Sequence, residues 1–262
     1  MALSGQQELR YARHLILEEV GEEGQERLLK SRVLVVGAGG LGSPLLLYLT
    51  AAGVGTLGVA DDDAVDLTNL QRQIVHSTAA VGRPKVDSAA ETLAAINPEI
   101  KVERHKLRLD AGNAEELVAR YDLVADGSDN FATRYVLNEA CFRQKKPLVW
   151  SALFRFEGQL TTFAAWRTEG ARGGNGPCLR CLFREPPPDG LVPRCETAGI
   201  LGAVAGVMGT LQATEVLKEL LGIGESLSGR LMLYDALSAE TRLINLKRDP
   251  ECPTCGRGKA AA

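Results

Sequence analysis

A glycine-rich segment between an apolar strand and an apolar helix limits the possible folds of this chain more than any other feature. Residues 33–36 are four consecutive apolar side chains, as in a buried parallel strand. Gly37, Gly39 and Gly42 then form a G-x-G-x-x-G pattern, and the apolar run 45–52 predicts a helix. Such glycines permit a tight turn, a close approach of the backbone to a phosphate and close packing of helix on strand. The segment therefore predicts a Rossmann-like βαβ unit with an anion at the start of its helix.

The sequence after this helix supplies the acid that a nucleotide site in such a unit uses. A second strand is predicted over 56–60 and ends at Asp61. Asp61 follows Gly42 at close to the spacing of about 20 residues at which an acid binds the ribose hydroxyls. This order of strand, glycines, helix, strand and acid indicates a site for an adenine nucleotide. The alternative is a glycine-rich turn that binds nothing.

Strand and helix patterns continue to alternate up to about residue 150. Further helices are predicted over 6–17, 24–30, 84–96, 113–120 and 132–144, and further strands over 100–107, 123–125 and 147–151. This alternation implies an open, mostly parallel sheet with right-handed crossovers.

The pattern changes after residue 150. We predict a hairpin of 154–156 and 159–166 joined through Glu157-Gly158, a buried helix over 200–221, and an antiparallel pair of 231–234 with 242–246. The predicted fold class is therefore α/β, with a Rossmann-like, mostly parallel sheet that antiparallel strands extend. We expect a single domain over residues 1–262, with a nucleotide-binding half (1–150) and a mixed-sheet half (151–262).

Charge and hydropathy argue against two classes of partner. The formal net charge of −3 provides no broad basic field for nucleic acid. The most apolar stretch, 200–221, contains Gln212, Glu215 and Lys218, so it predicts a buried helix and not a membrane span. Because the N-terminus has no signal-peptide pattern, we expect a cytoplasmic protein.

Two C-x-x-C pairs lie far apart in the second half of the chain. They are Cys178 with Cys181 and Cys252 with Cys255. Cysteines in a cytoplasmic chain indicate metal binding or catalysis before disulfides, and four thiolates can form a closed tetrahedral zinc site. The rival is a thioredoxin-type redox pair, but neither pair opens a helix after a strand. We therefore predict a structural zinc that holds the C-terminal segment and takes no part in catalysis.

Polar residues follow two strands of the predicted parallel sheet. They are Asn69, Gln71, Arg72 and Gln73 after the second strand, Asp129 and Asn130 after the fourth, and Lys85 at a helix start. Loops at these strand ends line the nucleotide crevice in such sheets. Hydride transfer does not need cations and a spare carboxylate near the phosphates. Nucleotidyl transfer does, because cations neutralise the triphosphate and a carboxylate holds Mg²⁺.

These motifs occur together, and in this order, in a known family. Besides the glycine loop and the cysteine pairs they are Arg10-Tyr11-x-Arg13, Asp61-x-Asp63, Asn69-Leu-Gln-Arg-Gln73, Gly82-x-Pro-Lys85 and Asp126-x-x-Asp129-Asn130. Over essentially its whole length the chain resembles the MoeB/ThiF group of activators of ubiquitin-like sulfur carriers, which are relatives of ubiquitin-activating enzymes. Thr68 stands where serine is common in the group, and the loop 167–177 is longer and richer in glycine.

The resemblance implies roles for the matching positions. Asp61 would bind the ribose, and Asp129 would hold Mg²⁺. The triphosphate-binding and charge-stabilising groups would be Asn69, Arg72 and Lys85. The other predicted nucleotide-site residues are Gly37, Gly39, Gly40, Gly42, Asp63, Thr68, Gln71, Gln73 and Asn130.

Two further residues receive roles from the resemblance. Arg13 resembles an arginine that reaches into the site of the partner subunit, which implies a homodimer. Cys195 resembles a conjugating or persulfide-linked cysteine of some relatives, and Arg194 beside it would favour the thiolate. The alternative is a loop cysteine with no chemistry.

The resemblance and the loop chemistry together predict an ATP-dependent adenylyltransferase that uses Mg²⁺ and contains Zn²⁺. Its second substrate would be the C-terminal Gly-Gly carboxylate of a β-grasp sulfur carrier from a molybdopterin, thiamine or tRNA-thiolation pathway. No rhodanese-like segment follows Cys255, so sulfur is expected from a separate protein such as a cysteine desulfurase or a rhodanese. The alternatives are an enzyme of the same fold that adenylates a different carboxylate, and an NAD-dependent dehydrogenase or NAD-sensing module.

Overall fold

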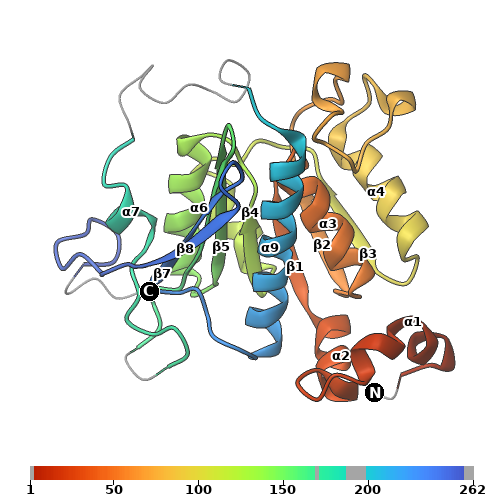
Figure 1. Ribbon diagram of the computed structural model, residues 1–262, viewed down its shortest axis with the longest axis horizontal. Coiled ribbons are helices and arrows are strands. Elements are labelled where there is room, and N and C mark those ends of the chain that lie inside the picture. The colour runs from red at the N-terminus through yellow and green to blue at the C-terminus, as the bar shows by residue number, and fades with distance from the viewer. Residues whose placement is uncertain (1–2, 169–170, 187–198, 257–262) are drawn as a thin grey trace.

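The protein folds around an eight-stranded sheet with helices on both faces (Figure 1). The structure is a computed structural model and describes residues 3–168, 171–186 and 199–256. The strand order is β3-β2-β1-β4-β5-β6-β7-β8. The strands from β3 to β5 run parallel, and β6, β7 and β8 extend the sheet in antiparallel fashion. The predicted fold class is confirmed.

The elements follow one another much as predicted. The strands are β1 (Arg32–Val36), β2 (Thr56–Ala60), β3 (Lys101–His105), β4 (Leu123–Asp126), β5 (Leu148–Phe154), β6 (Glu157–Phe163), β7 (Arg230–Asp235) and β8 (Glu240–Asn245). The helices are α1 (Gly5–Leu15), α2 (Gly21–Lys30), α3 (Gly42–Ala51), α4 (Lys85–Ile96), α5 (Ala114–Ala119), α6 (Phe131–Arg143), α7 (Leu179–Leu182) and α9 (Gly202–Leu221). Two 3₁₀ turns, η1 (Leu67–Asn69) and η2 (Thr78–Ala80), lie between β2 and α4.

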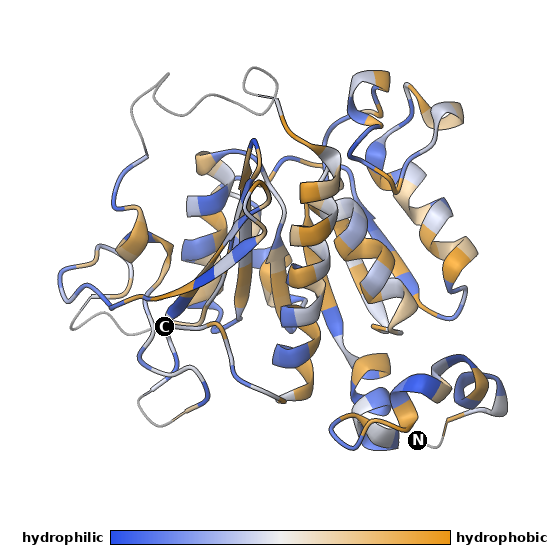
Figure 2. Cartoon of the chain, in the orientation of Figure 1, coloured by the Kyte–Doolittle hydropathy of each residue, from blue (hydrophilic) through white to orange (hydrophobic). Residues whose placement is uncertain are grey.

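The apolar side chains of the sheet form two cores, one on each face. Val33 and Val35 of β1 pack under α3, α4 and α9, whereas Leu34 packs with α5 and α6 on the other face. This division follows from the period of two in a strand, and it explains why β1 is apolar throughout. Figure 2 shows the hydrophobic colouring along the central strands. Among the described residues, no helix is long and apolar enough to cross a membrane.

The predicted hairpin near residue 154 was wrong in detail. The strands predicted over 147–151 and 154–156 are one strand, β5, and the turn consists of Arg155, at a φ of +54°, and Phe156. Gly158, which we expected in the turn, lies in β6, where a Cβ would collide with Met208 of α9. The close packing of α9 on the sheet therefore requires glycine at this position.

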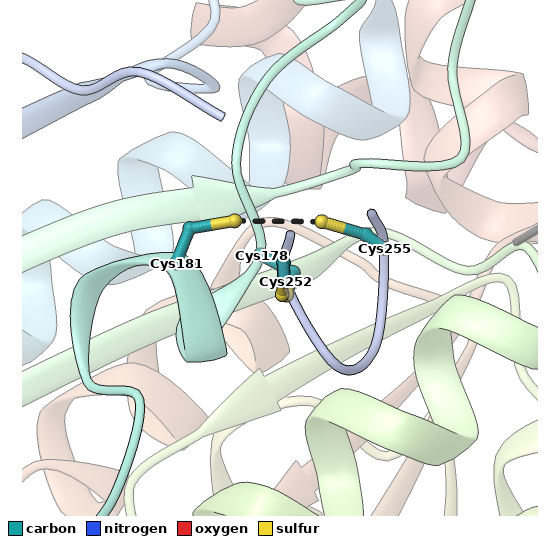
Figure 3. Close-up of side chains that lie close together, drawn as sticks. All are labelled: Cys178, Cys181, Cys252 and Cys255. Carbon is teal, nitrogen blue, oxygen red and sulfur yellow. Dashed lines mark hydrogen bonds between the residues drawn. The ribbon is translucent and has the colours of Figure 1, made fainter. Parts of the chain in front are cut away.

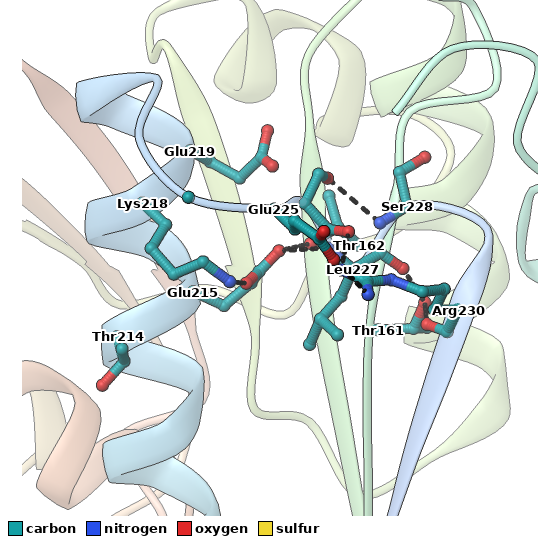
Figure 4. A network of polar contacts seen from close by, with 12 residues as sticks. Thr161, Thr162, Thr214, Glu215, Lys218, Glu219, Glu225, Leu227, Ser228 and Arg230 are labelled. Atoms are coloured by element: carbon teal, nitrogen blue, oxygen red, sulfur yellow. Dashed lines mark hydrogen bonds and ion pairs between the residues drawn. The ribbon is translucent and has the colours of Figure 1, made fainter. Parts of the chain in front are cut away.

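A buried carboxylate fixes helix α9 to the antiparallel strands (Figure 4). Glu215 accepts hydrogen bonds from the Thr162 hydroxyl (2.9 Å) and the Leu227 backbone N–H (2.7 Å), and the Lys218 ammonium lies 2.5 Å from its other oxygen. Three donors satisfy this carboxylate, so the core tolerates it. At its other end α9 begins at Gly202, against the backbone carbonyl of Gln71.

Helices α1 and α2 lie at the end of the sheet opposite the loop that follows β1 (Figure 1). The buried Tyr11 of α1 accepts a hydrogen bond from Asn97 Nδ2 (2.9 Å), just after α4 ends. His14 and Gln25 join α1 to α2 with a 2.8 Å hydrogen bond. These contacts hold α1 near the amino ends of the parallel strands.

Candidate functional site

Three neighbouring parallel strands end at the same level of the sheet. The register pairs Val36, the last residue of β1, with Ala60 of β2 and Asp126 of β4. The loops after these strands therefore start side by side, and the connections diverge between β1 and β4, where open α/β sheets bind ligands. We call residues 37–42, 61–73, 85 and 126–130 the carboxyl-edge cluster.

The glycine loop has the tight geometry that its sequence predicts. Gly37 has a φ of +92°, which favours glycine, and its N–H donates to the Ala60 carbonyl (2.8 Å). A Cβ on Gly42 would overlap the carbonyl oxygen of Gly37. Gly39 and Gly40 are partly exposed just before α3 begins. Backbone at a helix start in this position offers N–H groups to an anion.

Asp61 supports the glycine loop from the end of β2. Its Oδ2 accepts a hydrogen bond from the Ala38 N–H (2.8 Å), and its Oδ1 accepts one from the Asp63 N–H (2.9 Å). Burial raises the pKa of Asp61, and the positive charge of Lys85 opposes this effect. The side chain of Lys85 is 7% exposed, and its Nζ lies 2.7 Å from Oδ2 of Asp63. A nearly buried cation is thus held beside the loop.

The loop after β2 places two further side chains against the glycine loop. Cγ of Arg72 lies 3.4 Å from where a Cβ of Gly40 would stand, and Nε2 of Gln73 lies 3.7 Å from that of Gly39. Arg72 donates to Oδ1 of Asn69 (2.6 Å). Gln73 is buried, and its Oε1 has no hydrogen-bond partner among the described residues. A buried acceptor beside such a loop is available to a donor from a ligand or a water molecule.

Thr68 and Gln71 of the same loop are exposed and make local contacts. Asp66 accepts hydrogen bonds from the backbone N–H and the hydroxyl of Thr68. Oε1 of Gln71 accepts one from Arg72 (3.3 Å). These contacts shape the η1 turn, and the predicted nucleotide-binding roles of both residues stay predictions.

The loop after β4 carries an exposed carboxylate, Asp129. The carbonyl of Gly127 in this loop lies against Gly37 of the glycine loop. Asn130 caps α6 by accepting a hydrogen bond from the Thr133 N–H (2.9 Å). This cap fixes where α6 begins, and Asp129 lies directly before the cap residue.

A second acid of this loop, Asp126, is fully buried. Its Oδ1 accepts a hydrogen bond from the Ser128 N–H (2.9 Å). Burial raises the pKa of Asp126, and the nearby Arg134 opposes this effect. Asp126 therefore shapes the turn, whereas Asp129 is the carboxylate that a cation could reach.

The structure does not bring the predicted residue Arg13 to this edge. Arg13 is exposed on α1, at the other end of the sheet from the glycine loop (Figure 1). Cys195 lies outside the described residues. Their predicted roles stay predictions.

The four predicted cysteines meet in one cluster, which we call the four-cysteine cluster (Figure 3). The sulfurs of Cys178, Cys181, Cys252 and Cys255 all lie within 4.8 Å of one another. The Sγ atoms of Cys178 and Cys252 are 3.5 Å apart, and those of Cys181 and Cys255 are 3.4 Å apart. Three of the four side chains are buried, and Phe142 packs against the cluster. The predicted cluster is confirmed.

These distances fit a shared metal and not disulfides. Sulfurs at about 2.3 Å from a tetrahedral zinc are about 3.8 Å from one another, whereas a disulfide is about 2.05 Å long. Hydrogen bonds with neighbouring thiols, together with burial, raise the pKa of Cys178, whereas such hydrogen bonds lower the pKa of Cys181. A divalent cation would let all four ionise together.

Fold and clusters together define a Rossmann-like α/β protein with a closed cysteine cluster, and comparisons identify its family. The model of the ThiF family matches residues 11–254. The chain belongs to the ThiF family, as the sequence predicted.

Several curated proteins are similar to this chain over most of its length. It is 50% identical over 258 residues to "SAMP-activating enzyme E1" of Haloferax volcanii, covering 98% of this chain and 92% of that protein. It is 51% identical over 247 residues to "Sulfur carrier protein adenylyltransferase" of Thermus thermophilus, covering 94% and 90%. It is also 51% identical over 252 residues to "Probable adenylyltransferase/sulfurtransferase MoeZ" of Mycobacterium tuberculosis, covering 96% of this chain. The chain spans 63% of the length of that MoeZ.

Solved structures share the fold at lower sequence identity. MccB of E. coli with ATP superposes with a TM-score of 0.78 at 22% identity, covering 94% of this chain and 74% of that chain. MccB in complex with N-formylated MccA gives a TM-score of 0.80, also at 22% identity, covering 94% and 75%. At this identity the likeness shows the fold alone.

Two buried residues that shape the carboxyl edge were not predicted from the sequence. Gln212 of α9 donates from Nε2 to the carbonyls of Asp126 (2.8 Å) and Val149 (3.0 Å). Asp126 is the last residue of β4, and Val149 lies in β5. A polar residue inside an apolar helix was the available signal. His76 contacts the glycine loop, and nothing in its sequence neighbourhood indicated this.

Proposed function

We propose that this protein is an adenylyltransferase that uses ATP to activate the C-terminal carboxylate of a sulfur carrier protein. The observation that carries the proposal is the meeting of the glycine loop, Arg72, Lys85 and the Asp129 loop at one edge of the sheet. The printed names of the Thermus and Haloferax relatives support the same activity. An edge with two cations and an exposed acid suits transfer of a nucleotidyl group better than transfer of a hydride.

ATP would bind across the carboxyl-edge cluster. Asp61 would accept hydrogen bonds from the ribose hydroxyls, as acids at this position do in Rossmann-like units. The backbone of Gly37, Gly39, Gly40 and Gly42 would hold the phosphates at the start of α3. Further polar contacts would come from Asp63, Thr68, Asn69, Gln71, Gln73 and Asn130.

The carrier supplies its own nucleophile, a C-terminal carboxylate that we expect to end in Gly-Gly. This group is already an anion at neutral pH, so no general base is needed. One of its oxygens bonds to the α-phosphorus of ATP, the bond from that phosphorus to the bridging oxygen breaks, and pyrophosphate leaves. Arg72 and Lys85 would stabilise the charge on the phosphate oxygens. Asp129 would hold Mg²⁺, which neutralises further phosphate charge.

The site would be completed by Arg13 of the partner subunit in a homodimer. In its own chain, α1 is held at the amino end of the strands through Tyr11 and His14. Arg13 therefore has no evident route to its own glycine loop. An Arg13 guanidinium at the reacting phosphate would therefore come from a second copy.

Two further assignments accompany this reaction. The persulfide of a separate donor, such as a cysteine desulfurase or a rhodanese, would next attack the acyl carbon and displace AMP, and a thiol would cleave the resulting acyl disulfide to leave the thiocarboxylate. The four-cysteine cluster would hold one Zn²⁺ that stabilises the C-terminal segment, since four thiolates leave no position for a substrate. The single-domain organisation and the cytoplasmic location stay predictions.

ATP–pyrophosphate exchange in the presence of a Gly-Gly-ended carrier tests the proposal. We expect exchange that requires both Mg²⁺ and the carrier, and no hydride transfer. Exchange with a different carboxylate in place of the carrier would support the adenylation chemistry but would show that the substrate is not a sulfur carrier. Tight NAD binding, with no exchange for any carrier of the molybdopterin, thiamine or tRNA-thiolation pathways, would favour a dehydrogenase or an NAD sensor.

A further inference from the structure

The peptide group between the first two glycines of the loop is held on both sides. Ala38 is buried, and its N–H donates to Oδ2 of Asp61 (2.8 Å). Its carbonyl oxygen lies 2.9 Å from Nε2 of His76, which is itself 8% exposed. A carbonyl oxygen can only accept, so Nε2 carries the proton of this hydrogen bond.

The position of this carbonyl decides where the next N–H points. The carbonyl of Ala38 and the N–H of Gly39 belong to one planar trans peptide, so they point in opposite directions. His76 holds the carbonyl toward the protein interior, and the Gly39 N–H therefore faces away from the core, at a partly exposed glycine. No other described residue accepts a hydrogen bond from this N–H. Its remaining partner would be an anion in front of the loop.

The same imidazole reaches the helix that carries Lys85. Nδ1 of His76 lies 2.9 Å from the hydroxyl of Ser88, one turn after Lys85 on α4. With the proton on Nε2, Nδ1 accepts from this hydroxyl, so both ring nitrogens are satisfied in the neutral form. Burial lowers the pKa of His76, the hydrogen bond to Ala38 opposes this, and the charge of Lys85 lowers the pKa further. The ring thus links the glycine loop to the cation-bearing helix.

We propose that His76 is a positioning residue that aims the Gly39 N–H at the phosphates of the bound nucleotide. The inference rests on the proposed use of ATP. It assigns His76 no proton transfer and no direct contact with substrate. It predicts that loss of the bond to Ala38 weakens phosphate binding and leaves nucleoside binding unchanged.

Two substitutions of similar polarity test the roles of Nε2 and Nδ1 of His76 separately. The amide nitrogen of glutamine reaches the position of Nε2, so His76→Gln keeps a donor for the Ala38 carbonyl. Asparagine reaches only the position of Nδ1, so His76→Asn loses this donor. We expect His76→Asn to bind ATP about tenfold more weakly, the size of one hydrogen bond, with adenosine affinity unchanged. His76→Gln should bind both within about twofold of the wild type.

Thr92→Val provides the control. The Thr92 hydroxyl donates to the Val75 carbonyl (2.7 Å), so this variant loosens the neighbouring residue without touching Ala38. It should lower the melting temperature and leave the ratio of ATP to adenosine affinity unchanged. If His76→Asn does not fold, Ser88→Ala tests the same link, because it frees Nδ1. We expect it to weaken ATP binding about threefold and adenosine binding not at all.

The outcomes are distinct. Equal losses of ATP and adenosine affinity in His76→Asn, or wild-type ATP affinity in that variant, would overturn the inference. In Ser88→Ala, an unchanged ratio of the two affinities would do the same, as would a changed ratio in Thr92→Val. A wild-type protein that binds no ATP would instead refute the proposed function itself, and the inference with it.

Discussion

The carboxyl-edge cluster and the four-cysteine cluster differ in the chemistry and in the exposure of their side chains. At the carboxyl edge, Asp61 accepts a hydrogen bond from the glycine loop, Lys85 pairs with Asp63, and both Asp129 and Asp63 are exposed. In the four-cysteine cluster, soft ligands of one kind face one another, and Cys178, Cys252 and Cys255 are buried. An open set of mixed charges can admit a substrate and release a product. A closed set of four sulfurs can hold a metal but offers no position for a substrate.

The largest expected effect of a substitution lies at the carboxyl edge. Arg13→Ala and Asp129→Ala should each reduce adenylation by a hundredfold or more, because each removes a charged group proposed for the reacting phosphates. A loss of a few kcal/mol of transition-state stabilisation corresponds to about this factor. Exchange of pyrophosphate into ATP measures the loss, and the melting temperature shows whether each variant is folded.

A mixed dimer of these two variants tests whether the site is shared. One of its two sites would combine Asp129 from the Arg13→Ala chain with Arg13 from the Asp129→Ala chain. The other site would carry both defects. Co-expression under different tags should therefore yield a heterodimer with up to about half the activity of the wild-type dimer, one site of two being intact. A heterodimer as inactive as its parents would show that Arg13 does not act in trans.

A smaller effect, on stability and not on chemistry, is expected at the four-cysteine cluster. Cys252→Ser should lose the one zinc expected per chain, and a loss of about 3 kcal/mol would lower the melting temperature by about 10 °C. Well below that temperature, ATP binding should persist, because no cysteine belongs to the carboxyl-edge cluster.

The buried Cys141 gives a matched control for the zinc experiment, since it lies outside the cluster. Cys141→Ala should keep its zinc in elemental analysis. A native protein without zinc, whose cysteines all react freely with a thiol reagent, would contradict the metal assignment.

The smallest effect is expected at Cys195. If this residue only belongs to a loop, Cys195→Ala should keep both adenylation and thiocarboxylate formation, and this is the outcome we predict. If it relays sulfur or traps the carrier, adenylation should survive while thiocarboxylate formation fails. Mass spectrometry for a covalent adduct with the carrier separates the two cases.

Local patterns of the sequence predicted most of the fold, and both clusters, for a physical reason. Gly37 is required by its φ of +92° and Gly42 by its contact with the Gly37 carbonyl, both local to the loop, and the cysteine pairs have a ligand spacing that few other sites use. Contacts between distant residues were not readable. Gly158 packs against Met208, and His76 bonds to the carbonyl of a residue 38 positions earlier. Neither role could be inferred before the fold was known.

Turn chemistry accounts for the wrong hairpin. Glycine is the usual residue where φ is positive, so Glu157-Gly158 was the natural prediction for the turn. The structure instead places Arg155 at a φ of +54°. The bond from the Leu201 N–H to the Arg155 carbonyl (3.4 Å) joins this turn to the start of α9. A tertiary contact has here overridden a local preference.

The intact mass of the carrier tests the central claim most directly. Wild-type protein, Mg·ATP and a Gly-Gly-ended sulfur carrier should give a carrier heavier by one adenylate group, and a carrier that lacks its last glycine should gain nothing. Hydroxylamine, which displaces AMP from an acyl adenylate, should replace the added adenylate with the much smaller added mass of a hydroxamate. An unchanged carrier mass for every carrier tried, with the wild-type protein folded and containing zinc, would contradict the assignment of the carboxyl edge to adenylation of a carrier.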